Sequence, residues 1–183
     1  KPSLSQFMNW EAEQEGRHEF HRGEVFAMVG GRRGHSRIIA NLVRHLGNHL
    51  DGTPCQVFSE GMKVQIGDDT VLYPDVFVTC DQQFRFDEQV VTAPVLVIEV
   101  LSPTTQAYDR STKFAFYWHL QSLREYVLID PDTKRVELFR PAEDSHWKLF
   151  DMSDAPTLDL ASVDGRIALR DVFKGMGSGA DTT

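Results

Sequence analysis

Cysteine is scarce in this sequence, and its placement argues against two common kinds of site. Only Cys55 and Cys80 occur among 183 residues, each inside a predicted strand. They lack the clustered spacing of a zinc site or of a disulfide framework. We therefore expect both side chains to be reduced thiols in the core, as in a cytoplasmic protein.

Long apolar runs and an export signal are also missing. No stretch approaches the roughly 20 apolar residues that a membrane-spanning helix needs. The residues after Lys1 do not form a charged start followed by an apolar segment, as a secretion signal would. These absences predict a soluble protein that stays in the cytoplasm and has no membrane partner.

Basic residues are fewer than acidic residues in this sequence. The chain has 19 lysines and arginines against 27 aspartates and glutamates, so its formal net charge is -8. This balance argues against a protein that coats nucleic acid by general attraction to phosphates, although it is compatible with local basic patches. A site that gathers carboxylates around a divalent cation also adds negative charge, so a metal-dependent nuclease fits an acidic chain.

The chain does contain enough apolar material for one core. Hydrophobic residues make up 41% of its 183 positions, which predicts a single domain over residues 1–174. Residues 175–183 are rich in glycine, serine and threonine. This composition predicts a flexible C-terminal tail.

Hydrophobic periodicity predicts an α/β domain, because strand-like alternation and helix-like spacing both occur along the chain. The clearest helix pattern starts near Ser36, a candidate cap, and buries Ile38 and Leu42. Asp109 is expected to cap a later helix. The predicted helices span residues 4–14, 36–50 and 110–120, and the predicted strands span 18–21, 24–29, 55–59, 62–66, 71–79, 95–101, 126–129, 135–140 and 146–150, with one more within 157–172.

Glu99 is the most informative single residue. Its strand carries apolar residues on both alternating faces, which predicts a central strand that is covered on both sides. An ionised carboxylate there costs several kcal/mol unless a cation, hydrogen bonds or a water-filled cleft compensates it. We therefore expect a positive group opposite Glu99.

Asp75 is the expected partner of Glu99. It follows Pro74, which removes a backbone donor at the start of a strand, so that the next carboxylate can point into a cleft. Two neighbouring strand carboxylates repel each other, and a hard divalent cation such as Mg²⁺ relieves that repulsion by taking both as ligands. The pair predicts a metal site formed by Asp75 and Glu99.

Lys113 follows on a predicted helix and supplies a cation. A lysine near a phosphate and an activated water can position the nucleophile and offset charge in the transition state. Arg110 and Tyr117 share its helix face by the three-and-four spacing rule. They would present a second cation and a phenol to the same cleft.

Further polar residues are candidate accessories to this site. His35 lies near a predicted helix start, where phosphate binding is physically easy, among the basic residues Arg32, Arg33 and Arg37. Glu19 and Glu24 belong to the first predicted hairpin. Each is either a surface charge or an extra ligand that leans into the metal site.

Each candidate also has a purely structural interpretation. A Pro-Asp pair is common at turns, a core glutamate such as Glu99 can pair with an arginine, and Lys113 can lie solvated on its helix. Tyr117 is expected mainly to pack. His45 and His49 lie four apart on a helix, but no third zinc ligand is evident, so we interpret them as part of a solvated polar face.

A set of short motifs is similar to a known group of proteins. Pro74-Asp75, Glu99-Val100-Leu101 and the later Lys113 resemble the PD-(D/E)XK nuclease superfamily. More narrowly, residues 7–173 resemble the Uma-two putative restriction endonuclease family, also called domain of unknown function 820. The motifs that carry this resemblance are Glu19, Gly23-Glu24, His35, Tyr73-Pro74-Asp75, Ala93-Pro94, the run from Glu99 to Thr105, Asp109, Lys113, Tyr117 and Glu125-Tyr126.

The resemblance implies a restriction-endonuclease-like core, in which a mixed β-sheet is flanked by helices and extended by β-hairpins. It also implies that Asp75 and Glu99 bind Mg²⁺ and that Lys113 assists phosphodiester hydrolysis. The superfamily places its lysine two residues after the glutamate, where this sequence has Leu101. The resemblance therefore implies that Lys113 reaches the same point from the following helix.

These observations lead to one main hypothesis and two rivals. The main hypothesis is a Mg²⁺-dependent DNA endonuclease, with Mn²⁺ as a substitute ion. Because many double-strand cutters act as symmetric dimers, we also expect a homodimer. The rivals are a catalytically inactive nuclease-fold module that binds nucleic acid or a protein partner, and a phosphoesterase for a smaller substrate.

Overall fold

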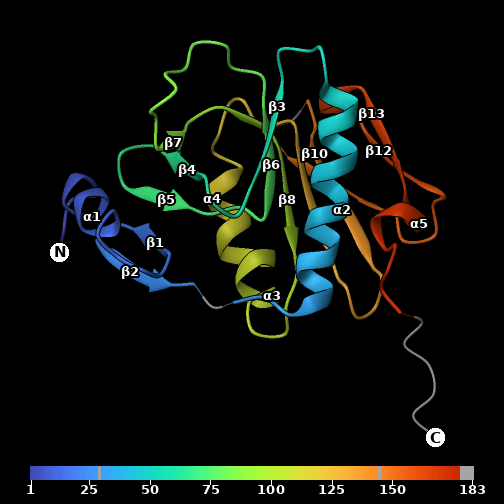
Figure 1. Cartoon of the computed structure of the whole chain (residues 1–183), viewed down its shortest axis with the longest axis horizontal. Helices are drawn as coiled ribbons and strands as arrows, with labels where there is room; N and C mark the ends of the chain where they lie inside the picture. The colour runs from blue at the N-terminus through green and yellow to red at the C-terminus, as the bar shows by residue number, and fades with distance from the viewer. Residues whose placement is uncertain (29, 144–145, 178–183) are drawn as a thin grey trace, which may run out of the picture.

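The computed structural model describes residues 1–28, 30–143 and 146–177 (Figure 1). Its helices are α1 (Leu4–Glu11), α2 (Arg33–Leu50), α3 (Gln106–Tyr108), α4 (Phe114–Tyr117) and α5 (Leu169–Val172), with a π-helical turn at Asp109–Lys113 and a 3-10 turn at Ala161–Val163. Its strands are β1 (His18–His21), β2 (Glu24–Ala27), β3 (Gln56–Ser59), β4 (Lys63–Ile66), β5 (Thr70–Leu72), β6 (Val76–Thr79), β7 (Val90–Val91), β8 (Pro94–Val100), β9 (Glu125–Ile129), β10 (Val136–Pro141), β11 (Trp147–Asp151), β12 (Thr157–Leu160) and β13 (Gly165–Ala168).

The strands form three sheets. The main sheet has the order β11-β10-β9-β8-β6-β3 and is mixed, because β8 and β9 run parallel while its other neighbours are antiparallel. A second sheet has the order β2-β1-β5-β4-β7, and β12 pairs with β13. Helices flank the main sheet and hairpins extend it, so the predicted mixed α/β architecture is confirmed.

The core lies on both faces of the main sheet, and the strand β8 is central to it. Leu96 and Ile98 pack with residues of α2 in one apolar cluster, whereas Val97 packs with Tyr117 of α4 in another. Alternate side chains of a strand point to opposite faces, so β8 must be apolar on both. The prediction of a central strand covered on both sides is confirmed. In Figure 1, α1 and the β1-β2 hairpin lie at one end of the molecule and α5 at the other.

The chain changes sheets at Tyr73-Pro74-Asp75. The prediction of one continuous strand over residues 71–79 was wrong, since β5 belongs to the second sheet and β6 to the main sheet. Pro74 has no N–H group and cannot donate within a sheet ladder. The interruption leaves Asp75 just ahead of β6, at the end of the main sheet.

Two helices begin earlier than predicted. The helix α2 starts at Arg33 with Arg32 as its cap, so Ser36 lies within its first turn. The helical segment that carries Lys113 starts at Gln106, and Asp109 opens a π-helical turn inside it instead of capping it. Hydroxyl groups before the segment account for the earlier start: the Ser102 Oγ accepts from the Thr105 N–H at 3.2 Å.

The C-terminal region is more regular than predicted. Residues 157–172 contain the paired strands β12 and β13 and the helix α5, where one short strand was expected. Val29, the last residue of the predicted return strand, and residues 178–183 of the predicted tail lie outside the described residues. Among the helices of the described ranges, we find none with the length and apolar character to cross a membrane.

Cys55 and Cys80 form a disulfide, so the prediction of reduced thiols was wrong. Gln56 of β3 pairs with Thr79 of β6, and the next position outward brings the two cysteines opposite each other. Directly opposed residues on antiparallel strands have close Cβ atoms, which is the arrangement that a disulfide needs. The sequence spacing did not show this pairing. Reduced thiols were one ground for expecting a cytoplasmic location, and that location stays a prediction.

We expect the disulfide to stabilise the fold. It links residues 25 apart in the sequence, and loop-closure entropy for a loop of this size corresponds to about 3 kcal/mol. The double variant Cys55→Ser/Cys80→Ser should therefore lose about 3 kcal/mol of unfolding free energy in urea denaturation. Dithiothreitol should lower the urea concentration at the unfolding midpoint of the native protein but not that of the variant. Two titratable thiols in the denatured, unreduced protein would contradict the bond.

Candidate active site

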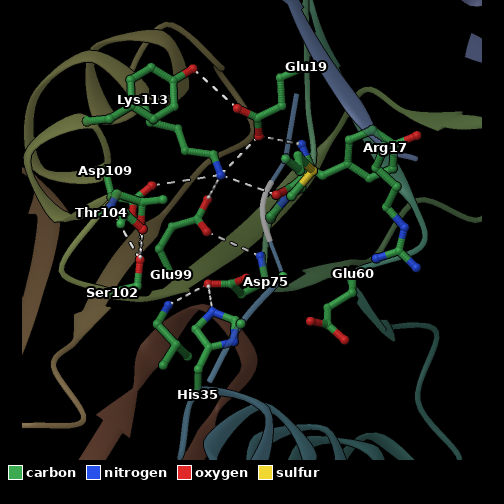
Figure 2. Close-up of a pocket in the computed structure, with 18 of the residues that line it drawn as sticks. Arg17, Glu19, His35, Glu60, Asp75, Glu99, Ser102, Thr104, Asp109 and Lys113 are labelled. Atoms are coloured by element: carbon green, nitrogen blue, oxygen red, sulfur yellow. Dashed lines mark hydrogen bonds and ion pairs between the residues drawn. The ribbon is translucent and has the colours of Figure 1, made fainter. Parts of the chain in front are cut away.

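A cavity of about 550 Å³ opens where the two larger sheets meet. Its wall combines the β1-β2 hairpin, the start of α2, the ends of β6 and β8, and the helical segment with Lys113 (Figure 2). This volume lies within the range of small-ligand and active-site pockets. Of the residues proposed from the sequence, those that line it are Glu19, His35, Asp75, Glu99 and Lys113.

Three carboxylate residues occupy neighbouring positions on adjacent strands. In the main sheet Ser59 pairs with Val76, and Val76 pairs with Ile98. One position further toward the same end of the sheet lie Glu60, just after β3, Asp75, just before β6, and Glu99 in β8. The Glu60 N–H donates to the Asp75 carbonyl at 3.3 Å, and the Asp75 N–H donates to Glu99 Oε2 at 3.2 Å. Strand register thus creates a row of three acids at one end of the sheet.

Asp75 is held by two further contacts. Its Oδ2 accepts a hydrogen bond from the Val100 N–H at 2.7 Å and lies 3.2 Å from His35 Nε2. Both side chains are mostly buried, with 14% of Asp75 and 12% of His35 exposed. Burial alone lowers the pKa of His35, but its hydrogen bond to Asp75 and the nearby negative charges raise that pKa overall.

Lys113 is the positive group beside Glu99. Its Nζ lies 3.0 Å from Glu99 Oε1 and 3.1 Å from Glu19 Oε1, and it donates to the Tyr73 carbonyl at 3.2 Å (Figure 2). The contact with Glu99 is an ion pair and not a well-aligned hydrogen bond. Asp109 Oδ1 is 3.9 Å away. The side chain reaches both acids from the helical segment that follows β8.

Burial and mutual repulsion dominate the electrostatics of the cavity. Burial raises the pKa of Glu99 well above its usual value; the charge of Lys113 opposes this rise, and Asp75 adds to it. Burial would lower the pKa of Lys113, but Glu99, Glu19 and Asp109 raise it overall. Burial also raises the pKa of Asp109 to about 6. The carboxylates outnumber the amine, so the cavity favours an additional cation.

Three of the proposed accessories do not face this cavity. Glu24 is exposed on β2 and pairs with Lys1 at 3.0 Å. Arg110 pairs with Glu137, and Tyr117 is fully buried in the core. The spacing rule that grouped Arg110 with Lys113 holds for α-helices, whereas the π-helical turn bonds residues five apart and so separates their directions.

The histidines on the outer part of α2 are not gathered around a common site. His49 Nε2 lies 2.9 Å from the Val163 carbonyl, and His45 is near Arg44. Within the described ranges, the group of side chains with metal-ligand spacing is His35, Glu60 and Asp75. This agrees with the interpretation of His45 and His49 as polar surface residues.

Sequence reasoning missed several polar residues of the cavity, among them Glu60 and Tyr108. Glu60 follows β3 in a turn with a φ of 33°, and only the pairing of β3 with β6 brings it beside Asp75. Tyr108 donates its hydroxyl hydrogen to Glu19 Oε2 at 3.3 Å, and burial raises its pKa. Neither residue carries a local sequence signal, because both contacts depend on segments far apart in the chain.

The donor groups of the cavity fit a divalent cation. His35, Glu60 and Asp75 each offer one ligand atom, and these atoms lie within 4.8 Å of one another. Carboxylate oxygens are the usual ligands of Mg²⁺ and Mn²⁺, and imidazole nitrogen adds affinity for transition ions. A possible metal-binding cluster is therefore present in the cavity.

A solved structure has the same fold. The chain matches a crystal structure of a putative nuclease from Anabaena variabilis that belongs to domain of unknown function 820. The TM-score is 0.79 with 22% sequence identity, and the match covers 96% of this chain and 99% of the other. The expected restriction-endonuclease-like fold is confirmed.

Sequence comparisons identify the family. One uncharacterized protein of Synechocystis sp. is 36% identical over 96% of this chain and 93% of its own length. A second uncharacterized protein of the same organism is 31% identical over 82% of this chain and 86% of its own length. The model of the family Uma2, described as putative restriction endonuclease, matches residues 4–167. With most of its length matched in this way, the chain belongs to the Uma2 putative restriction endonuclease family, as the motifs around Asp75 and Glu99 suggested.

Proposed function

We propose that this protein is a divalent-metal-dependent DNA endonuclease that hydrolyses phosphodiester bonds. The observation that carries the proposal is the Lys113 amine 3.0 Å from Glu99, whose other oxygen accepts from the Asp75 N–H, at the wall of an open cavity. The family description supports a nuclease. Two acids and one amine in a cleft are the groups that metal-assisted phosphodiester hydrolysis uses.

Each residue has a distinct role in the proposal. Asp75 and Glu99 would hold Mg²⁺, or Mn²⁺ in its place. When bound, the ion would acidify the attacking water and offset the charge that develops on the phosphate. Lys113 provides a fixed positive charge that orients the water and stabilises the transition state, since three carboxylates within 4 Å favour its ammonium form.

Substrate binding needs positive charge around the acidic cavity. Arg17 lines the cavity and is exposed, and α2 begins beside it with three exposed arginines, Arg32, Arg33 and Arg37. In the proposal these residues contact DNA phosphates and carry no base specificity. They explain how an acidic protein can approach a polyanion.

The proposal also covers the domain structure, the oligomeric state and the location of the protein. It includes one domain over residues 1–174, a homodimer whose two sites act on the two DNA strands, and action in the cytoplasm. Light scattering at working concentration tests the dimer, and a monomeric mass there would remove it.

Loss of either metal-binding carboxylate should abolish cleavage. Purified protein should nick supercoiled plasmid with Mg²⁺ or Mn²⁺ and stop when EDTA is added. Asp75→Ala and Glu99→Gln should each lower the nicking rate by at least about 100-fold. Asp68→Ala, in an exposed turn, is the matched control and should keep full activity. Nicking that survives both site variants would remove the mechanism, and DNA binding without any nicking would favour the inactive module.

Removal of the buried cation should affect both stability and activity. Lys113→Met keeps the length of the side chain but leaves Glu99 and Glu19 without their positive partner. Urea denaturation should show a loss of about 3 kcal/mol in unfolding free energy. Nicking by the folded fraction should fall about 100-fold. Lys148→Met, on an exposed strand position, should change neither quantity. Unchanged stability would show that the ion pair is not formed.

The arginines at the start of α2 should contribute to DNA affinity through salt-dependent contacts. The triple variant Arg32→Ala/Arg33→Ala/Arg37→Ala should weaken binding to unrelated DNA sequences by a similar factor. Its salt dependence should also be less steep, by close to one unit of slope for each phosphate that the variant no longer neutralises. Fluorescence anisotropy over a range of salt concentrations measures both. An unchanged salt dependence would show that DNA does not bind at these arginines.

A further inference from the structure

The two sides of Asp75 differ in how many of their polar atoms already have a hydrogen bond or an ion pair. On one side, Glu99 is 1% exposed, with Oε1 against the Lys113 amine and Oε2 on the Asp75 N–H. On the other side, Glu60 has no hydrogen bond or ion pair through its side chain to any described residue. An incoming cation therefore finds more available ligand atoms on the side of Asp75 that faces Glu60.

His35 belongs to this second side, and two neighbours limit the position of its ring. It comes from α2, and its Nε2 points at Asp75 Oδ2, 3.2 Å away (Figure 2). The other face of the ring is packed against the chain before α2: a Cβ on Gly31 would lie 2.5 Å from His35 Nδ1. Glycine at this position lets the imidazole sit against the backbone, which orients Nε2 toward the acids.

The spacing of the three groups is close to that of ligands to one ion. Their candidate ligand atoms lie within 4.8 Å of one another. Ligand bonds of about 2.0–2.2 Å put two ligands of the same ion at most about 4.4 Å apart. Glu60 lies in a turn and lines the cavity, so a small movement of its side chain would close the difference.

We propose that His35 and Glu60 are further ligands of the ion held at Asp75, so that its ligand set includes one nitrogen, and that the site prefers a divalent transition ion such as Mn²⁺ over Mg²⁺. The inference rests on the proposed function only in assigning the ion to the same carboxylate, Asp75. Imidazole nitrogen is a good ligand for first-row transition ions, whereas Mg²⁺ prefers an all-oxygen shell that keeps several waters. His35 is thus the residue that determines which metal is used.

Pulsed electron paramagnetic resonance on the full-length chain with Mn²⁺ tests the site directly, because coupling to a histidine nitrogen is visible independently of activity. One bound Mn²⁺ with nitrogen coupling is expected, with at least tenfold tighter binding than Mg²⁺ in calorimetry. His35→Ala should remove the coupling and weaken Mn²⁺ binding at least tenfold. Glu60→Gln should weaken binding similarly and keep the coupling.

Controls separate ligand loss from unfolding. His45→Ala, on the same helix but outside the cavity, should leave coupling and affinity unchanged. Gly31→Ala keeps the imidazole but pushes it aside, so it should weaken Mn²⁺ binding without removing a ligand group. Circular dichroism melting confirms that each variant is folded.

The outcomes also distinguish this inference from the proposed function. Mn²⁺ bound with nitrogen coupling that depends on His35, but without plasmid nicking, would support the metal site and remove the nuclease. Nicking together with Mn²⁺ that shows no nitrogen coupling would support the nuclease and overturn the site. Equal affinity for Mg²⁺ and Mn²⁺, or full Mn²⁺ affinity in His35→Ala, would overturn it as well.

Discussion

The ion pairs of Lys113 are the interactions on which the rest of this structure depends. The amine contacts Glu99 of β8 and Glu19 of β1, and these strands belong to different sheets. One buried cation therefore joins the main sheet to the second sheet. Each of these acids would be very unfavourable in the core by itself, so the helical segment that carries Lys113 must dock for the sheets to meet.

The backbone at the sheet junction is held by the same acids. Glu19 Oε1 accepts from the Tyr73 N–H at 3.0 Å, and Glu99 Oε2 accepts from the Asp75 N–H at 3.2 Å. Pro74 lies between them and has no N–H to satisfy. A segment that leaves one sheet and enters another would otherwise expose buried donors, and side-chain carboxylates replace the missing strand partners. The same residues therefore hold the junction together and line the cavity.

The cavity consequently has two sides that differ in how their side chains are paired. Glu99 and Lys113 form a buried ion pair on one side, whereas on the other side of Asp75 the Glu60 side chain has no hydrogen bond or ion pair with a described residue. This difference arises because Glu60, Asp75 and Glu99 lie side by side at one end of three neighbouring strands.

The sequence by itself determined the central apolar strand, the helix α2, the mixed α/β class and the expectation that Asp75 and Glu99 share a cavity, because these follow from local periodicity and from the free energy of burying charge. Only tertiary structure decided which strands pair across distant parts of the chain. That pairing joins Cys55 to Cys80 and brings Glu60 beside Asp75, contacts that no local pattern encodes. It was also the π-helical turn, a feature without a clear sequence signal, that directed Lys113 to the acids and Arg110 to Glu137. Local sequence patterns determine which segments form helices and strands. Strand register and packing between distant segments determine which side chains become neighbours.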